Sequence, residues 1–260
     1  MNTIYELDTS NFLSWDDHSF SGEVIMSLFV ILFIILLSFV IFFIFRKRDP
    51  LKPDKGFVLV VETLVEKLDA FVLEVMGRKW MKFAGYVLGL AMFILFSFLI
   101  GITGLPNPLT SLTVPLSLGL CTFVLIHVTA IKANHWRYFK RYVDPVAVFL
   151  PVNLLSMWAP LISISLRLFG NALSGYCLMS IVYYFLRLAA SAITQASMAS
   201  AASIWLAPLI APFFHLYFDV FSGAIQTLIF CILTMIWISN EDPDEEEEKQ
   251  ASVKGEAVTE

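Results

Sequence analysis

Residues 146–186 read VAVFLPVNLLSMWAPLISISLRLFGNALSGYCLMSIVYYFL and carry one formal charge, at Arg167. A straight α-helix of that length would measure about 60 Å, whereas the hydrocarbon layer of a bilayer is about 30 Å thick. Residues 203–239 form a second long apolar run, with Asp219 as its one formal charge. Each run contains two prolines. We therefore expect helices that tilt steeply, bend at their prolines, or begin as shorter interfacial helices.

Three shorter runs without a formal charge precede this pair, at residues 24–45, 83–102 and 112–131. Each has the roughly 20 apolar residues that a membrane-spanning helix needs. The predicted fold class is an all-α membrane protein with five transmembrane passes. Its last two helices form a long, steeply tilted hairpin over residues 146–239, joined near residues 187–202. A hydrophobic content of 58% and a charged content of 15% argue against both a soluble enzyme and a disordered chain.

Basic residues indicate which ends of the spans face the cytoplasm. Residues 46–48 are Arg-Lys-Arg, and the loop 132–145 carries four basic side chains. We therefore predict an outward-facing N-terminal segment (1–23), a basic cytoplasmic loop (132–145) and an acidic, disordered cytoplasmic tail (240–260). Residues 57–77 mix apolar residues with five charges, which predicts an amphipathic helix on the cytoplasmic surface or under the bundle. Gly85 and Gly89 form a GxxxG motif, which we interpret as a weak helix-packing notch at best.

The sequence lacks the signals of several other functions. It has no GxxxxGK[ST] phosphate loop, so we expect this chain to bind no nucleotide. Residues 1–240 hold 13 acidic and 15 basic side chains, and this near-neutral body does not favour nucleic acid as a partner. Its three cysteines have no metal-ligand spacing. We predict neither a cofactor nor a metal, and we interpret the cysteines as buried free thiols.

Arg167 is expensive to place in a membrane, because a guanidinium keeps its proton at any physiological pH. It therefore needs an anionic partner, a water-filled cavity, or both. One interpretation is a static ion pair with Asp219. The other is functional: Ser163, Gly170 and Asn171 share a helix face with Arg167, and small neighbours would leave the guanidinium accessible to another molecule.

The final helix carries a second polar face. At α-helical spacing, one column contains His215, Asp219, Ser222, Gly223 and Gln226. An imidazole titrates near neutral pH and a buried carboxylate can do the same, so this column suits proton transfer. Polar residues satisfied by hydrogen bonds between helices are the alternative interpretation.

Two stretches of the sequence resemble a known family. SLRLFGN at residues 165–171, together with FSGAIQTLIFCILTMIWIS at residues 221–239, is similar to subunit a of F-type ATP synthases. The resemblance implies that Arg167 is the essential stator arginine, that Asn171 is a nearby channel amide, and that Gln226 faces the arginine. Tyr176 stands where bacterial relatives usually carry Glu, and Asp219 stands where they often carry His. We infer that Asp219, together with His215, exchanges protons in the outer half-channel.

The resemblance also implies partners and a mechanism. The partners would be a c-ring of hydrophobic hairpin subunits, the peripheral-stalk subunit b, the rest of the F-type ATP synthase, and the lipid membrane. The chain would form two proton half-channels against the rotating ring and would be a non-catalytic subunit of a rotary enzyme. A bacterial plasma membrane is the simpler location, with an organelle inner membrane as the alternative. Two rival functions are a secondary transporter gated by an Arg167–Asp219 pair and a non-transporting membrane scaffold.

Overall fold

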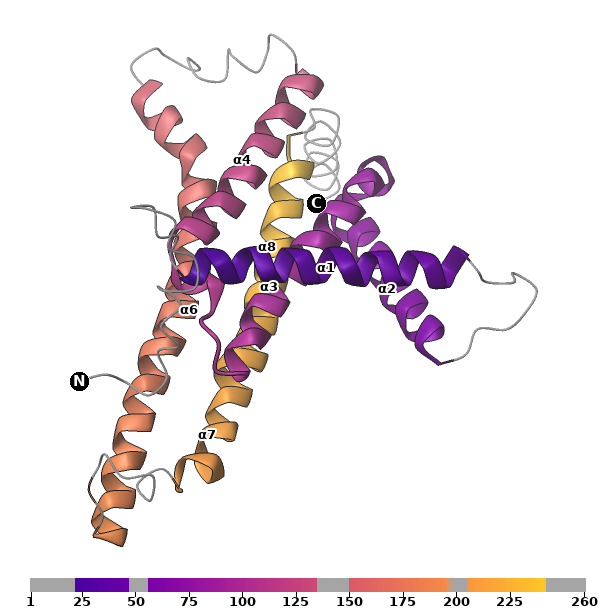
Figure 1. Cartoon of the computed structure of the whole chain (residues 1–260). Helices are drawn as coiled ribbons and strands as arrows, with labels where there is room; N and C mark the ends of the chain where they lie inside the picture. The colour runs from indigo at the N-terminus through magenta and orange to yellow at the C-terminus, as the bar shows by residue number, and fades with distance from the viewer. Residues whose placement is uncertain (1–21, 47–55, 135–149, 196, 198–204, 242–260) are drawn as a thin grey trace, which may run out of the picture. The chain divides into compact units, whose positions relative to one another are not determined.

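The computed structural model describes residues 22–46, 56–134, 150–195, 197 and 205–241 (Figure 1). Within these ranges every element is helical. Five helical stretches are long and apolar enough to cross a membrane: Gly22–Arg46, Arg78–Ile102, Thr113–Ala133, Leu155–Thr194 and Ala207–Ser239. The prediction of an all-α membrane protein with five spanning helices is therefore confirmed. The acidic tail from residue 242, most of the basic loop, and the N-terminal segment up to residue 21 lie outside the described residues.

The elements follow one another along the chain without strands between them in the described ranges. They are α1 (Gly22–Arg46), α2 (Phe57–Met76), η2 (Arg78–Phe83), α3 (Ala84–Ile102), η3 (Pro108–Thr110), α4 (Thr113–Asn134), α6 (Leu150–Thr194), α7 (Ala207–His215), the π-helical segment η6 (Leu216–Phe221) and α8 (Ser222–Ser239). The helix expected over residues 57–77 thus corresponds to α2. It buries Val72 and Met76 and exposes several apolar side chains, among them Phe57 and Val60.

Large apolar side chains are exposed along most of the spanning helices. In α1 only Ser27 and Val30 are buried, while most of its Phe, Leu and Ile side chains are exposed. In water, so much contiguous apolar surface would drive association or aggregation. In a bilayer the same surface meets lipid tails, and the backbone polar groups are satisfied inside each helix.

Helix α6 is longer than the sequence predicts. Residues 187–202 were expected to connect the two long helices, but α6 continues to Thr194. Residues 188–194 read LAASAIT, a stretch in which alanine and leucine favour the helix. Gln195 then adopts a left-handed backbone conformation with φ 53°, which ends the helix. Pro160 lies inside α6, whereas Pro151 is its second residue, where a missing N–H costs nothing.

The second long run is interrupted by a change of helix type. Pro208 lies in the first turn of α7, and Pro212 lies inside it. After His215 the chain forms six residues of π-helix before α-helical geometry resumes at Ser222. A π-turn closes its hydrogen bonds over one more residue than an α-turn, so it rotates the faces that follow relative to those that precede it.

The chain forms two compact units, and most of the spanning helices contribute to both. Unit 1 takes its described residues from the ranges 1–39, 91–115 and 166–228, and unit 2 from 40–90, 116–165 and 229–260. In unit 2 the hydroxyl groups of Tyr86 and Thr122 lie 2.8 Å apart and join α3 to α4. The rings of Phe123 and Trp158 join α4 to α6, with centroids 4.9 Å apart. All the candidate site residues lie in unit 1.

Candidate functional site

Three contacts align α6 with the α7–η6–α8 segment inside unit 1. Ser222 Oγ donates a hydrogen bond to Asn171 Oδ1 at 3.0 Å. A β-carbon on Gly175 would lie 3.8 Å from Phe218. Tyr183 and His215 are joined by a hydrogen bond. Because the residue numbers rise on α6 as they fall on the other segment, the two run antiparallel (Figure 1).

Arg167 lines a hollow of about 350 Å³, which we call the arginine hollow. Its walls come from α6, η6 and α8: Arg167, Asn171, Tyr217, Phe221, Ser222, Ile225 and Gln226. The Arg167 side chain is exposed. Among the described residues it has no carboxylate within ion-pair distance and no hydrogen-bond acceptor. The guanidinium therefore lies in an open recess, not in a closed internal ion pair.

Gln226 also lines the arginine hollow. Its side chain is only 5% exposed, and its amide nitrogen has no hydrogen-bond partner among the described residues. A buried amide without a partner costs about 1–3 kcal/mol. The hollow thus presents an exposed, permanent positive charge, which suits an anionic visitor, whereas the Gln226 amide nitrogen is buried.

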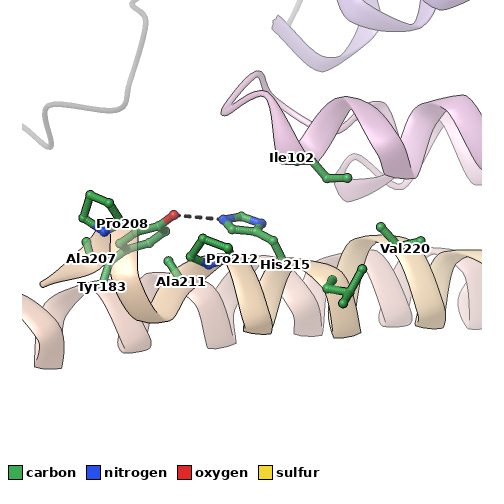
Figure 2. A pocket seen from close by; sticks show the side chains of 9 residues that line it. Ile102, Tyr183, Ala207, Pro208, Ala211, Pro212, His215 and Val220 are labelled. Atoms are coloured by element: carbon green, nitrogen blue, oxygen red, sulfur yellow. Dashed lines mark hydrogen bonds between the residues drawn. The ribbon is translucent and has the colours of Figure 1, made fainter.

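A second group, the tyrosine–histidine–aspartate cluster, consists of Tyr183, His215 and Asp219. His215 Nδ1 donates to Asp219 Oδ2 at 2.5 Å, and these side chains are 19% and 16% exposed. The Tyr183 hydroxyl lies 2.8 Å from His215 Nε2, and Figure 2 shows the two side chains pointing toward each other. Tyr183 and His215 also line a cavity of about 390 Å³, which extends to Ile102 and Pro208.

Glycines let neighbouring helices approach this cluster closely. A β-carbon on Gly101 of α3 would lie 3.3 Å from Asp219 Oδ1, so the absence of a side chain there brings the α3 backbone up to the carboxylate. A β-carbon on Gly223 would lie 2.7 Å from both Cβ and Cγ of Phe98, which is closer than two carbons can come. Gly223 therefore fixes the distance between α8 and α3.

The polar column expected on the last helix does not form one continuous face. Asp219 bonds to His215 and lies beside Gly101, whereas Ser222 bonds to Asn171 and Gln226 lines the arginine hollow. The π-helical segment contains Asp219, ends directly before Ser222 and changes the register. Arg167 and Asp219, both in the described part of unit 1, form no ion pair with each other.

The structure brings together most of the predicted site residues and adds one. Arg167, Asn171, Ser222 and Gln226 share the arginine hollow, and His215 and Asp219 form a pair. Tyr176 belongs to neither group, and its side chain is 60% exposed. Tyr183, which bonds to His215, was not predicted from the sequence. It lies seven residues after Tyr176, on the same side of an α-helix, so the pattern offered two tyrosines and no means of choosing between them.

The sequence matches the ATP synthase A chain family over residues 24–239. The chain belongs to this family. It is 36% identical over 222 residues to ATP synthase subunit a of Mycoplasma genitalium, covering 81% of this chain and 76% of that protein. It is 32% identical over 240 residues to ATP synthase subunit a of Mycoplasma pneumoniae, covering 88% and 82%. The resemblance found in residues 165–171 and 221–239 is therefore confirmed, and it extends to nearly all of the helical region.

The chain also matches a relative of lower sequence identity. ATP synthase subunit a of Mycoplasmoides gallisepticum is 29% identical over 248 residues, which cover 91% of this chain and 83% of that protein. The chain thus spans most of the length of each of these bacterial relatives. Together with the five apolar helices, this makes it a multi-pass membrane protein.

Proposed function

We propose that this chain is the stator subunit a in the membrane sector of an F-type ATP synthase. In this role it forms two proton half-channels against a rotating c-ring and couples proton flow to ATP synthesis or hydrolysis. The observation that carries the proposal is the arginine hollow. Arg167 is exposed there without an acidic partner in the described residues, while Asp219 is already bonded to His215.

A guanidinium in a membrane span, without an acidic partner among the described residues, needs a visitor of opposite charge. A ring carboxylate that faces lipid must be protonated, because an isolated charge in hydrocarbon is very costly. Beside Arg167 the ionised form is favoured instead. A carboxylate that arrives therefore releases its proton to one half-channel, passes the arginine, and takes up a proton from the other. The positive charge also opposes direct leakage of protons between the half-channels.

Neighbouring residues supply hydrogen bonds to this exchange. Gln226 lines the arginine hollow, with its amide nitrogen buried and without a partner among the described residues, and Asn171 accepts a hydrogen bond from Ser222. The His215–Asp219 pair lies beside its own cavity and contains two groups able to gain and lose protons. We assign this pair to the outer half-channel. Tyr176, which is exposed and outside both groups, is a weaker candidate for the proton path.

The proposed role fixes partners and location. The chain assembles with a c-ring of small hydrophobic hairpins, with the peripheral-stalk subunit b and with the rest of the ATP synthase. It resides in a bacterial plasma membrane, with its N-terminus outside and its C-terminus in the cytoplasm. The basic residues 46–48 and the basic loop support this orientation through the positive-inside rule.

A secondary transporter gated by an Arg167–Asp219 pair is the rival function. That mechanism needs the two charges to meet, but in the described residues Asp219 bonds to His215 and Arg167 lines a different hollow. The family match favours the stator, and so does the lack of an acidic partner for Arg167 in the part of the chain that the structure describes.

The test is purification of the tagged chain in mild detergent, followed by reconstitution into liposomes. We expect a small, very hydrophobic subunit with a mid-membrane carboxylate to co-purify, and the complex to make ATP when a proton gradient is imposed. Liposomes with the chain alone are the control and should show neither ATP synthesis nor uptake of solutes. Solute-dependent uptake by the chain alone, or a purified complex without a carboxylate-bearing hairpin subunit, would contradict the proposal.

A further inference from the structure

We infer that Tyr183 is a positioning residue for proton transfer: its hydroxyl holds His215 in the orientation and tautomer that deliver a proton to Asp219. The inference rests on the proposed function, because it deepens the assignment of this cluster to the outer half-channel. It is based on two hydrogen bonds that connect three side chains. Tyr183 Oη lies 2.8 Å from His215 Nε2, and His215 Nδ1 lies 2.5 Å from Asp219 Oδ2.

The position of the imidazole proton decides whether each ring nitrogen of His215 donates or accepts its hydrogen bond. A neutral imidazole has one N–H and one bare nitrogen. When the Asp219 carboxylate is ionised it only accepts, so Nδ1 carries the proton and Nε2 is bare. The Tyr183 hydroxyl then donates to Nε2. A phenol at this position therefore stabilises the tautomer that directs its N–H at Asp219.

The line of three groups takes up a proton by a balanced shift. A hydronium ion in the cavity gives a proton to the Tyr183 oxygen while the hydroxyl proton moves to Nε2. The Nδ1 proton moves at the same time to Asp219 Oδ2. Tyr183 and His215 remain neutral, and Asp219 becomes a neutral carboxylic acid, so the cluster as a whole has gained one proton. Asp219 then passes this proton on, and proton exchange with water, in which Nε2 loses one proton and Nδ1 gains one, restores the starting tautomer.

The position of the cluster gives this path a direction. Tyr183 and His215 line the cavity of about 390 Å³, and Figure 2 shows them at its wall. Asp219 is absent from the residues that line this cavity, and it lies against Gly101 of α3. The tyrosine end is therefore the entry from the cavity, and the carboxylate end is the exit.

Tyr183→Phe in the whole complex tests the inference, because it removes the hydroxyl and keeps the ring. Tyr184→Phe is the matched control, since Tyr184 is the next residue, is 52% exposed and has no hydrogen bond among the described residues. We measure proton-driven ATP synthesis and ATP-driven proton pumping per assembled complex. Tyr183→Phe should lower both rates about tenfold, the factor that corresponds to losing one ordinary hydrogen bond. Tyr184→Phe should stay within about twofold of the unmodified complex.

A second measurement separates positioning from a merely structural role. Nitrogen-15 spectra of histidine-labelled complex report which imidazole nitrogen carries the proton, and His215→Gln identifies the signal of His215. We expect one tautomer, protonated at Nδ1, in the unmodified complex and in Tyr184→Phe. Tyr183→Phe should keep the proton on Nδ1, where Asp219 accepts it, but should shift the Nε2 signal, because the bare nitrogen loses its hydrogen bond. An unchanged His215 signal in Tyr183→Phe, or an unchanged rate, would overturn the inference.

A double variant keeps the test decisive if Tyr183→Phe assembles poorly. His215→Gln removes the middle of the line, so Tyr183→Phe added to His215→Gln should lower the rate no further than His215→Gln alone. Additive losses would show that the two residues act independently and would also overturn the inference. An unmodified complex with neither proton-driven ATP synthesis nor ATP-driven proton pumping would instead contradict the proposed function itself.

Discussion

The two formal charges in the long apolar runs, Arg167 and Asp219, have different surroundings in unit 1. Asp219 receives a hydrogen bond from His215 at 2.5 Å, and its side chain is largely buried. Arg167 is exposed in the arginine hollow and has neither a hydrogen bond nor an ion pair among the described residues. The first arrangement suits a group that exchanges protons within the chain. The second suits a fixed charge that acts on something outside the chain.

Replacing Asp219 by Asn should lower proton flux through the assembled complex by about a hundredfold or more, the scale of a lost general acid or base. The amide oxygen can still accept from His215 Nδ1, so assembly should be preserved, but an amide does not take up and release protons near neutral pH. The measurement is ATP-driven acidification of inverted membrane vesicles.

Asp69→Asn on α2 is the control for this substitution, because it makes the same chemical change outside unit 1. It should leave the acidification rate close to that of the unmodified complex. Normal acidification in Asp219→Asn would remove this residue from the proton path and direct attention to His215 or Tyr176.

At the residue scale, the sequence predicts which side chains matter better than it predicts their partners. Arg167 and Asp219 stand out because a charge in an apolar run is costly wherever it lies. Their partners depend on which residues of another helix lie at the same level. Tyr176 and Tyr183 are equivalent by spacing, and only the antiparallel alignment of α6 with α7 brings Tyr183 to His215.

At the element scale, the π-helical segment decides the layout of the site. Six residues, Leu216–Phe221, separate the His215 side of the chain from the Ser222 side. With uniform α-helical geometry, Asp219 and Gln226 would share one face. Instead Asp219 is directed at His215 and Gly101, and Gln226 at the arginine hollow. The sequence carries no local signal for this change, because a π-turn forms where tertiary contacts favour the extra residue.

The packing of α8 against α3 makes Gly223 sensitive to substitution. Gly223→Ala would place a carbon 2.7 Å from Phe98 Cβ and Cγ, so α8 or α3 must shift. We expect a loss of about 1–3 kcal/mol in stability, the usual cost of overpacking. The measurement is the temperature at which the subunit aggregates from the purified complex.

Gly89→Ala in α3 is the matched control, because no atom of the described residues lies within 4 Å of an added β-carbon there. Its aggregation temperature should stay the same or rise slightly, since alanine favours the helix over glycine. If Gly223→Ala were as stable as Gly89→Ala, the close α3–α8 contact would be wrong.

The elements themselves were more predictable than their contacts. All five spans follow from apolar runs of sufficient length, because backbone groups in lipid leave the chain no alternative to a helix. The GxxxG of Gly85 and Gly89 was not a useful guide, because both glycines face open space in the described structure. The close contacts occur at Gly101, Gly119 and Gly223, and no motif marks them. Sequence spacing reveals a small residue, but not whether a neighbour uses it.

At the scale of the whole molecule, the proposed orientation, with five spans in the described residues, would place the two ends of the chain on opposite sides of the membrane. We predict that a green fluorescent protein fused to the C-terminus fluoresces, because it remains in the cytoplasm. A tag on the N-terminus should be removed by protease added to intact cells stripped of any cell wall. The matched control is the same protease applied to the C-terminal fusion, which should stay intact. Both ends accessible from one side would contradict the five-span architecture.

The central claim for the whole molecule is that Arg167 acts on carboxylates supplied by a partner ring. The most direct test is proton-driven ATP synthesis by reconstituted complexes that carry Arg167→Gln, with Arg187→Gln on the same helix as the control. We predict that Arg167→Gln lowers synthesis by about a hundredfold or more, because an opposite charge shifts a carboxyl pKa by about 1–3 units. Arg187→Gln should retain most of the activity at equal assembly. Synthesis at the unmodified rate in Arg167→Gln would contradict the account.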